Sequence, residues 1–496
     1  MKIKFFLKIC FLFFLVACGG VNADSFLKGV HRFKLDNGIT VLIVSRGEAP
    51  VFSAFTRIKV GNIEESPHAT GLAHFFEHMA FKGTPTIGTK NYQLEKGLLE
   101  EIHELGTKIV LLKKRGMQDK DLKSYQEQFK TLEEEYKKFI IPNEFVRVLQ
   151  RHGGADLNAN TSNDFTNYYV SLPSNRLEMW AYMESERLLN PVYREFYKER
   201  EVVAEERRMR YENSPDGQIY EAFVSEAFQT SPYKNNVIGK PEHIANYTYE
   251  QARAFHDRYY IPSRMVISLV GDLDVKKTLE VVKHYFEKLP TRPDSITQIL
   301  PESLEGFPKS KTIRGQGGAR MYVGFYRPAY PHVDDKVFDV LDTLLCQGRT
   351  SRLYASLVLE QKLASQVGCD ASLPGTRLDG LFTIYAQPLP PHTNQDLFQG
   401  ILEELHKLKT ELVTSAELEK VKNNVDAHRV WAMKSNMGLA STLSFYESLT
   451  GNWNNLNTLI DEIKKIQAED IQAVAKHYFI SERQVTAFFE PQMETK

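Results

Sequence analysis

Two histidines and a glutamate in one short apolar segment have the spacing of a metal site. His74 and His78 are four residues apart, and Glu77 lies between them in the pattern His-x-x-Glu-His. No Pro or Gly interrupts residues 74–81, which predicts a helix, and side chains at i and i+4 share one face of a helix. Three ionisable groups in apolar surroundings are costly unless they share a partner. We therefore predict that both histidines bind one cation; core histidines bonded to backbone carbonyls are the alternative.

A third ligand is expected from an acidic helix further along the chain. A catalytic zinc ion usually takes three protein ligands and leaves a fourth position for water. Residues 199–208 offer four glutamates in a helical pattern. Glu199 and Glu206 are seven residues apart, hence about two turns apart on nearly the same face, so one could bind the metal while the other supports a ligand. The pattern alone does not choose among the four, and an exposed charged helix is the alternative.

The elements around these residues occur twice along the chain. The segment around Tyr259, a helix running into a short strand, matches the segment around Tyr478 at a constant offset of 219 residues. Strand-like residues 51–60 precede the helix that carries His74, and strand-like residues 320–326 precede a helix at 335–345. This repeat predicts an α+β fold of two homologous halves, each a mainly antiparallel sheet with helices, produced by an internal duplication.

The first half also contains a helical insertion at residues 91–140. Two runs with apolar residues at intervals of three and four are separated by residues 115–119, which predicts a helical hairpin. A solvated insertion is the favoured interpretation, and a wall or lid over a binding chamber is the alternative. We place the first half at residues 18–290, a linker poor in periodic apolar residues at 291–310, and the second half at 311–496.

The N-terminus predicts export from a bacterial cytoplasm. Lysines flank and interrupt an apolar run from Phe5 to Ala17 that is too short to span a bilayer stably. Residues 15–19 resemble a lipobox, so residues 1–17 would be a lipoprotein-type signal peptide and Cys18 the lipid-bearing first residue of a periplasmic, membrane-anchored protein. Cleavage after Ala23, which would leave a soluble periplasmic protein, is the alternative.

Composition and the remaining cysteines restrict the class of protein further. The chain is 42% hydrophobic and 25% charged, which indicates a folded protein, and its net charge of −1 gives no excess of cations to hold nucleic acid. Only Cys346 and Cys369 fall in the folded part. Export permits a disulfide between them, but we favour two buried thiols.

Further motifs accompany the metal-binding pattern and together resemble a known family. These motifs are Glu199-Arg200-Glu201-Val202, Asn158-Ala159-x-Thr161 followed by Thr166-x-Tyr168-Tyr169, and Ser351-Arg352-Leu353-Tyr354. With His-x-x-Glu-His they resemble the insulinase/pitrilysin metallopeptidases (inverzincins), in particular two-domain bacterial members similar to the metal-bearing subunit of mitochondrial processing peptidase. The resemblance covers almost the whole chain after the signal peptide.

The resemblance implies a role for each motif. His74, His78 and Glu206 would bind one Zn²⁺ per chain, Glu77 would act as general base, and Glu199 would support the site from behind. The strand that begins at Asn158 and Ala159 would be the edge to which a substrate peptide adds as an extra strand. Zinc lowers the pKa of its bound water towards about 7, and hydrolysis of peptide bonds follows.

The second half departs from the family pattern. The span from His74 to Glu206 is 132 residues and its counterpart from Phe338 to Asn424 is 86, a difference of 46 that matches the hairpin. The residues near Phe338 and Asn424 cannot rebuild a zinc site, so only the first half is expected to bind metal.

Many family members also carry an Arg and, seven residues later, a Tyr in the second half, which contact the substrate and its developing oxyanion. Here Val358 and Ser365 occupy those places. Either Arg352 substitutes, or the enzyme is weak, or a homologous partner supplies the pair, and we favour the partner.

The sequence therefore predicts a zinc-dependent endopeptidase, the metal-bearing subunit of a hetero-oligomer. It would cleave peptides or unfolded segments and contact the membrane only through its lipid anchor. A non-catalytic scaffold or peptide-binding subunit of a similar complex is the alternative.

Overall fold

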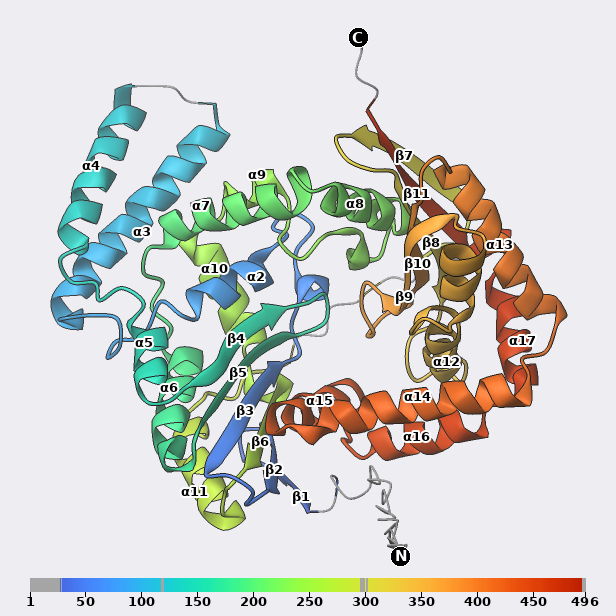
Figure 1. Cartoon of the computed structure of the whole chain (residues 1–496). Helices are drawn as coiled ribbons and strands as arrows, with labels where there is room; N and C mark the ends of the chain where they lie inside the picture. The colour runs from blue at the N-terminus through green and yellow to red at the C-terminus, as the bar shows by residue number, and fades with distance from the viewer. Residues whose placement is uncertain (1–26, 28, 117–119, 295–298, 300–301, 493–496) are drawn as a thin grey trace, which may run out of the picture.

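Two sheet-containing halves face each other in the molecule (Figure 1). The computed structural model describes residues 27, 29–116, 120–294, 299 and 302–492. The predicted signal segment 1–17 and the predicted lipid site Cys18 lie outside the described residues. Within the described part of the chain, no helix combines the length and the apolar character needed to cross a membrane.

The first half is built on a six-stranded sheet with the order β1-β2-β6-β3-β5-β4. All neighbouring strands are antiparallel except β2 and β6, which are parallel. The strands are β1 (Val30–Lys34), β2 (Thr40–Ser45), β3 (Val51–Ile58), β4 (Ala155–Thr161), β5 (Thr166–Pro173) and β6 (Met265–Gly271). β6 is buried along its whole length, whereas β4 forms an edge of the sheet.

The second half repeats this topology in five strands with the order β7-β11-β8-β10-β9. The strands are β7 (Lys309–Gly315), β8 (Arg320–Arg327), β9 (Ala364–Leu373), β10 (Gly380–Pro388) and β11 (Gln484–Pro491). If β1 is left out, the strand orders of the two sheets agree position by position. Each sheet also has one parallel pair at the same place, β2 with β6 in the first half and β7 with β11 in the second. The predicted α+β fold of two homologous halves is therefore confirmed.

Helices flank both sheets. In the first half they are α2 (Leu72–Met79), α3 (Tyr92–Lys114), α4 (Lys120–Tyr136), α5 (Glu144–Arg151), α6 (Leu177–Leu189), α7 (Phe196–Arg207), α8 (Pro215–Ala227), α9 (Pro241–Ile244), α10 (Tyr249–Tyr259) and α11 (Val275–Phe286). In the second half they are α12 (Asp335–Cys346), α13 (Asn394–Thr410), α14 (Ser415–Lys434), α15 (Asn436–Thr450), α16 (Asn455–Lys465) and α17 (Ala468–Tyr478). The predicted linker 291–310 falls between α11 and β7, and its last two residues already belong to β7.

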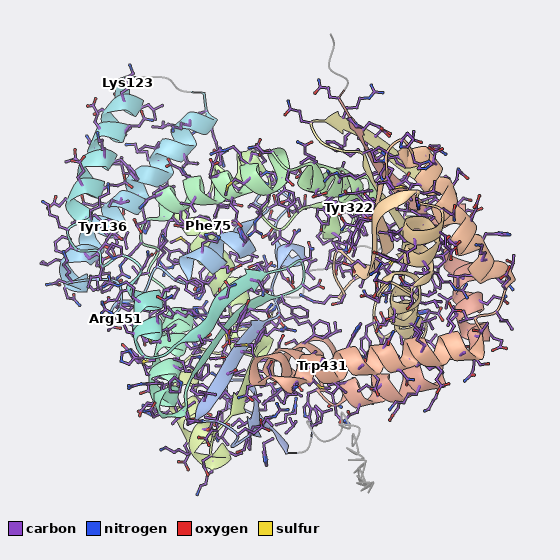
Figure 2. All side chains as sticks on the ribbon, viewed as in Figure 1. Phe75, Lys123, Tyr136, Arg151, Tyr322 and Trp431 are labelled. Carbon is purple, nitrogen blue, oxygen red and sulfur yellow. A yellow bond between two sulfur atoms is a disulfide. The ribbon has the colours of Figure 1, made fainter. Side chains whose placement is uncertain are left out.

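The two halves exchange helices across their interface. α8 of the first half packs on β7, β8 and β11 of the second sheet, and α15 of the second half packs on β3 and β6 of the first. Phe223 of α8 lies on Tyr322 of β8 with ring centroids 5.2 Å apart, and Figure 2 places Tyr322 beside the end of α8. Leu443 of α15 is fully buried in a cluster with Phe55 of β3 and Val270 of β6. Each sheet thus completes its core with a helix from the other half.

The predicted helical hairpin is α3 and α4, and it lies on the side of the first half away from the second half (Figure 1). α3 begins where the Asn91 side chain accepts a hydrogen bond from the Leu94 N–H. Its buried face, including Leu99 and Ile102, joins the main core of the first half. The hairpin is therefore anchored in that core, and its position does not agree with a lid over the space between the halves.

Cys346 and Cys369 form a disulfide, so the expectation of two buried thiols is wrong. The bond joins the end of α12 to the middle of β9, which are 23 residues apart in the sequence. Sequence spacing gave no reason to favour it, because packing of α12 against the second sheet is what brings the two side chains together. A structural disulfide is typical of proteins in oxidising compartments.

Candidate metal centre

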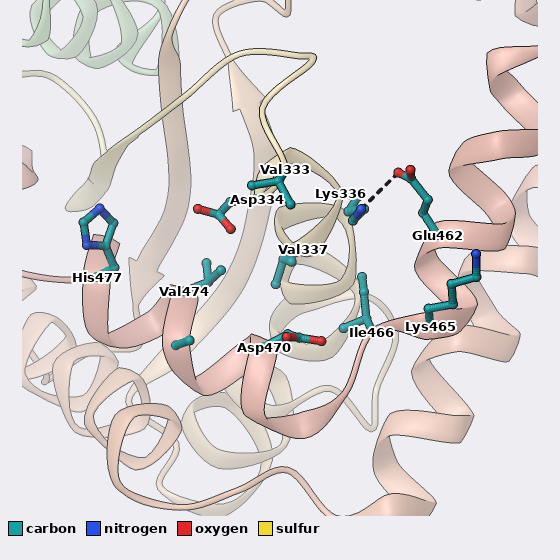
Figure 3. A pocket seen from close by; sticks show the side chains of 11 residues that line it. Val333, Asp334, Lys336, Val337, Glu462, Lys465, Ile466, Asp470, Val474 and His477 are labelled. Atoms are coloured by element: carbon teal, nitrogen blue, oxygen red, sulfur yellow. Dashed lines mark hydrogen bonds and ion pairs between the residues drawn. The ribbon is translucent and has the colours of Figure 1, made fainter.

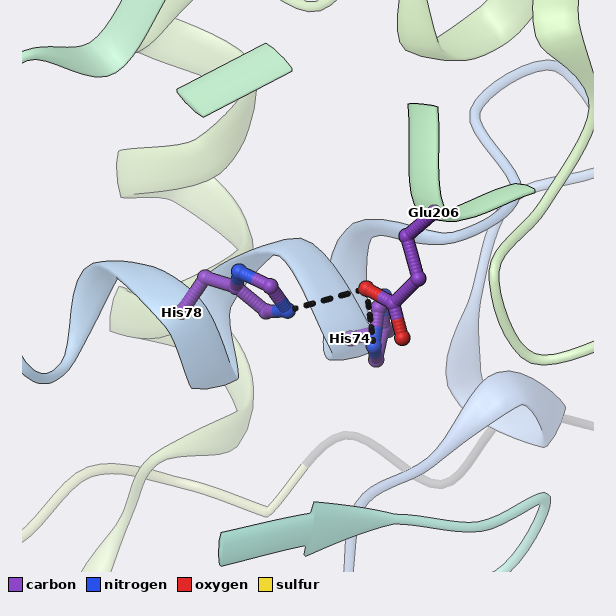
Figure 4. A group of neighbouring side chains, drawn as sticks. All are labelled: His74, His78 and Glu206. Atoms are coloured by element: carbon purple, nitrogen blue, oxygen red, sulfur yellow. Dashed lines mark ion pairs between the residues drawn. The ribbon is translucent and has the colours of Figure 1, made fainter. Parts of the chain in front are cut away.

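Helix α2 carries His74, Glu77 and His78, and Figure 4 shows the imidazoles of His74 and His78 on one side of it. It begins directly after Gly71, whose φ of 92° lies in the left-handed region, where a side chain would also collide with the Ile238 carbonyl. Apolar residues on its other sides are buried in the first half's core. Because that packing fixes the orientation of the helix, the polar face is held in one position.

Glu206, near the end of α7, completes a group of three donors. Its Oε2 atom lies 3.6 Å from Nε2 of His74 and 3.4 Å from Nε2 of His78. Ligand atoms of all three side chains lie within 4.8 Å of one another. Figure 4 shows the Glu206 carboxyl pointing at both imidazoles from above α2. The predicted ligand set is therefore brought together from two separate helices.

Residues behind the three donors hold one of the histidines in place. His78 Nδ1 lies 2.9 Å from Oε1 of Glu199, one of the four glutamates on the acidic segment. Oε2 of Glu199 contacts Nζ of Lys82 at 2.5 Å, and Lys82 also lies 3.4 Å from Glu195. A carboxylate on the far nitrogen of a histidine orients the ring and raises its basicity as a metal ligand. The structure thus separates the roles of Glu199 and Glu206, which the spacing alone left open.

The predicted general base, Glu77, stands beside this group and is held by the sheet. Thr161, the last residue of β4, donates a hydrogen bond from its hydroxyl to Oε2 of Glu77 at 2.5 Å. Burial raises the pKa of Glu77, while the Thr161 hydrogen bond opposes that rise. Only Oε2 of Glu77 accepts this hydrogen bond, which holds the carboxyl beside the edge strand β4.

The two imidazoles have opposite electrostatic surroundings. Burial lowers the pKa of His74 to about 4. Burial also acts to lower the pKa of His78, but its hydrogen bonds to Glu199 and Glu206 outweigh that effect and raise it to about 9. Although burial opposes the shift, His78 and Lys82 lower the pKa of Glu199 to about 2. Glu199 and Glu206 thus favour positive charge at His78, as they would favour a cation bound there.

The donors fit a zinc ion by chemistry and by separation. Two imidazole nitrogens and one carboxylate form a ligand set found in catalytic zinc sites. Atoms that bind a tetrahedral zinc at about 2.0–2.2 Å lie roughly 3.4 Å apart, which agrees with the separations of 3.4 and 3.6 Å here. In the part of the chain that the structure describes, this is the one group of three or more His, Cys, Asp or Glu donors close enough for a metal ion.

The predicted substrate strand is β4, at the edge of the first sheet. Asn158 is exposed and Ala159 half-buried, and they pair on their inner side with Tyr169 and Tyr168 of β5. The outer side of β4 has no neighbouring strand among the described residues. An unpaired edge of this kind offers N–H and C=O groups to an extended peptide.

Val358 and Ser365, which the family resemblance is expected to set at an Arg and a Tyr position, lie in the second half. Val358 lies in a π-helical turn at Tyr354–Glu360, and the Ser365 hydroxyl on β9 donates to the Gln387 carbonyl at 3.2 Å. Arg352 makes two hydrogen bonds to Glu417, at 2.8 and 2.7 Å, so its guanidinium is already engaged.

Elsewhere in this half, a groove of about 510 Å³ lies between α12, α16 and α17 (Figure 3). Its apolar floor and ion-paired rim, where Lys336 meets Glu462 at 3.0 Å, show no resemblance to the metal centre.

Three residues near the site were not singled out as functional from the sequence. Lys82 reaches Glu199, Thr161 reaches Glu77, and Arg210 lies 3.0 Å from Oε1 of Glu206. Lys82 and Arg210 each lie four residues after a proposed ligand, a helical spacing that could have indicated them. Thr161 belongs to one of the motifs that carry the family resemblance. Its contact partner Glu77 lies 84 residues earlier in the sequence, so no local pattern could predict the contact.

Comparisons with known proteins agree with this geometry. A sequence model described as "Insulinase (Peptidase family M16)" matches residues 40–129 and 137–241, and one described as "Peptidase M16 inactive domain" matches residues 246–425. The chain is 28% identical over 483 residues to the zinc protease PqqE of Helicobacter pylori, covering 95% of each protein. It is 23% identical over 455 residues to the uncharacterized zinc protease YmxG of Bacillus subtilis, covering 91% of this chain and 96% of that protein.

Solved structures show the same architecture. A protease from Helicobacter pylori has a TM-score of 0.78 at 26% identity, over 93% of this chain and 99% of that one. The periplasmic protease PqqL from Escherichia coli shares the fold, with a TM-score of 0.68 at 19% identity, over 93% of this chain and 48% of that one. The chain has two homologous halves, an intact His-x-x-Glu-His helix in the first half and matches to both domain models. It is therefore a two-domain member of the insulinase/pitrilysin family, peptidase family M16.

Proposed function

We propose that this protein is a zinc-dependent endopeptidase that hydrolyses peptides or unfolded segments. The observation that carries the proposal is the convergence of Glu206 on the Nε2 atoms of His74 and His78, with Glu77 beside them. The names of relatives such as PqqE support zinc and proteolysis. His74, His78 and Glu206 would hold the ion, which when bound supplies an activated water and polarises the carbonyl of the scissile bond.

The chain's own residues would then position the peptide and move the proton. The peptide would lie along the free edge of β4 and receive main-chain hydrogen bonds there. Glu77 would take a proton from the attacking water and later give it to the leaving amine. Thr161 would keep the Glu77 carboxyl aligned with the peptide, because it ends the strand that binds the peptide and also donates to that carboxyl.

The test is Glu77→Gln in the full chain, with metal content and turnover of an unstructured peptide measured together. The variant should keep its zinc and lose activity by about 10² or more, because general-base catalysis contributes roughly 10²–10⁴. Glu205→Gln is the matched control, since Glu205 lies on α7 with a side chain 56% exposed. A non-catalytic scaffold would show no proteolysis in the wild-type protein either, and that result would reject the proposal.

A homologous partner subunit is part of the proposal. Val358 and Ser365 cannot supply the donors that the Arg and Tyr positions supply in many relatives, and Arg352 is bound to Glu417. A partner chain with the intact pair would raise peptide hydrolysis strongly over that of the purified chain. Full activity of the isolated chain would contradict the partner. The same experiment with the Glu77→Gln variant shows whether any gain comes from this chain's metal centre.

The proposed location is the periplasmic side of a bacterial membrane, with a lipid on Cys18. The apolar run before Cys18 supports export, and the disulfide supports an oxidising compartment. The Escherichia coli relative PqqL is described as periplasmic. Mass spectrometry of the mature N-terminus tests this directly: an acylated Cys18 is expected, and an unmodified N-terminus after Ala23 would show the soluble alternative.

A further inference from the structure

A cavity of about 440 Å³ lies behind the metal-binding helix. Its walls come from α3 of the hairpin, the loop 189–193 between α6 and α7, and one face of α10. Phe76 of α2 packs on Tyr193 and His256, with ring centroids 5.9 and 4.9 Å away, and both of these residues line the cavity. Phe76 lies about 160° around the helix from His74 and His78. The cavity is therefore separate from the metal centre and on the opposite side of α2.

Two buried polar side chains of this cavity have no partner. His103 is 4% exposed, and neither ring nitrogen makes a hydrogen bond to any described residue. The Tyr193 hydroxyl, in a side chain 5% exposed, likewise bonds to nothing in the described part of the chain. Buried polar groups are nearly always hydrogen-bonded to protein or to ordered water, so two unpartnered groups in one cavity mark a place where a polar molecule can bind. Burial lowers the pKa of His103 to about 3, so its neutral ring offers one donor and one acceptor.

The floor of the cavity is aromatic. The His103 ring stacks on Tyr249 with centroids 4.0 Å apart and planes 5° from parallel. Tyr193 meets the edge of the same Tyr249 ring at 5.3 Å, and Tyr92 lines the cavity as well. Such a floor favours a flat ring in the ligand, and the two unpartnered groups favour a polar substituent on that ring.

The mouth of the cavity carries exposed charges of both signs. Lys96 and Glu100 of α3 have side chains 56% and 63% exposed, and they lie 3.8 Å apart. Arg253 and Asp257 of α10 are 63% and 42% exposed, and they lie 3.7 Å apart, while Arg292, which also lines the cavity, lies 2.9 Å from Asp257. Exposed pairs at 3.7–3.8 Å are weak and open readily to a competing ligand, whereas Asp257 keeps Arg292 as a closer partner. The mouth can thus receive a carboxylate at Lys96 and Arg253 and an ammonium group at Glu100.

We propose that this cavity binds a small zwitterion with a hydroxylated aromatic ring, of the size of a dipeptide that contains tyrosine. The ring would lie on the aromatic floor with its hydroxyl at His103 and Tyr193, while the two charged ends meet the charges at the mouth. A volume of about 440 Å³ lies within the usual range of roughly 300–1,000 Å³ for small-molecule sites. Such a dipeptide is a product of peptide hydrolysis, so its biological meaning rests on the proposed function, whereas its binding does not.

The experiment is calorimetric titration of Gly-L-Tyr into the full chain carrying Glu77→Gln, which cannot turn the probe over. One dipeptide per chain is expected. His103→Phe and Tyr193→Phe, each added to that background, should weaken binding about tenfold, because each removes hydrogen bonds and keeps the ring. Tyr285→Phe is the control, since Tyr285 lies on α11 and does not line the cavity. Melting temperatures verify that every variant is folded.

Related probes and one further variant separate the possible outcomes. Gly-L-Leu lacks the ring, tyramine lacks the carboxylate and N-acetyl-tyrosine lacks the ammonium group, so each should bind about tenfold more weakly. His74→Ala should leave binding of Gly-L-Tyr unchanged. Binding that is lost in His74→Ala but kept in the cavity variants would place the dipeptide at the metal centre and overturn the proposal, as would the absence of binding at millimolar concentration. A chain that binds the dipeptide but cleaves no peptide would refute only the proposed function.

Discussion

Single side chains around His78 form a relay of contacts that leads away from the metal centre. His78 contacts Glu199, Glu199 contacts Lys82, and Lys82 also contacts Glu195 at the start of α7. Each contact is polar and largely sheltered from water, so each limits the orientation of the one before it. The position of Nε2 of His78 therefore depends on residues outside the group of proposed metal ligands.

This relay predicts that Glu199→Ala will weaken zinc binding by 10- to 100-fold, the usual effect of removing the group that orients a histidine ligand. Glu199→Gln should have a smaller effect, because the amide oxygen still accepts a hydrogen bond from Nδ1 of His78. Competition with a chromogenic chelator measures the affinity. Glu205→Ala on the exposed side of α7 is the control. A Glu199→Ala variant with wild-type zinc affinity would show that the ring is oriented by packing alone.

At the scale of elements, the edge strand β4 brings the proposed base and the proposed substrate site together. Thr161 ends the strand and donates to Glu77, while Asn158 and Ala159 lie earlier on the same strand. The pairing of β4 with β5 is irregular between Ala155 and Asn158, where Asp156 has a positive φ of 54°. Bulges of this kind re-aim an edge strand and are common beside active sites.

If peptides add to β4 as a strand, backbone groups of the substrate must alternate between the strand and solvent. A series of peptides with one N-methylated amide each should therefore show an alternating pattern. Methylation at every second position should lower kcat/KM about tenfold, because one main-chain hydrogen bond is lost, and the positions between should change little. Loss of activity that does not alternate would argue against strand addition.

The disulfide belongs to the same scale, because it joins α12 to β9. A bond that closes a loop of 23 residues is expected to stabilise the fold by about 2–4 kcal/mol, mainly by restricting the unfolded chain. The double variant Cys346→Ala, Cys369→Ala should lose that amount of unfolding free energy in denaturant titrations. Wild-type protein treated with a reductant should behave like the variant, and the variant should not respond to reductant. Equal stability of oxidised and reduced wild type would contradict this expectation.

Elements with local signals were predictable, and contacts between distant elements were not. The helix of His74 and His78, the hairpin and the repeated halves follow from periodicity and spacing, and all are present in the fold. The disulfide and the Thr161–Glu77 hydrogen bond depend on how helices pack on sheets, and periodicity carries no such information. The choice of Glu206 over Glu199 as the third donor came from the family resemblance. Its geometric reason required coordinates, because only they show that Glu206 lies at Nε2 of His78 and Glu199 at Nδ1.

At the scale of the whole molecule, the halves depend on each other through polar contacts as well as apolar ones. Asp164, in the turn between β4 and β5, accepts hydrogen bonds from Thr376 in the loop between β9 and β10 and from Tyr233 at 2.7 Å. Arg377 of that loop reaches Glu64 of the first half at 2.9 Å. These contacts place a loop of the second half directly beside the turn that ends β4, the proposed substrate strand.

The exchange of α8 and α15 makes a strong prediction about the halves in isolation. Residues 18–300 expressed alone would expose the face of β3 and β6 that α15 covers, including Phe55 and Val270. An exposed apolar sheet face of that kind promotes aggregation. The two pieces, 18–300 and 301–496, should therefore each be insoluble or unfolded when produced singly, yet form a soluble complex when produced together.

Leu443→Asp in the second piece should abolish this complementation, because it would bury a charge in the interface against β3 and β6 without a partner. Exposed Trp431 on α14, substituted in the same way, is the control. Co-purification of the pieces and their zinc content give the result. Because all three donors lie in the first piece, zinc bound by that piece alone, in a folded and soluble state, would show that the second half is not needed to form the metal centre. Zinc found only in the complex would show that the geometry of the site is a property of the whole molecule.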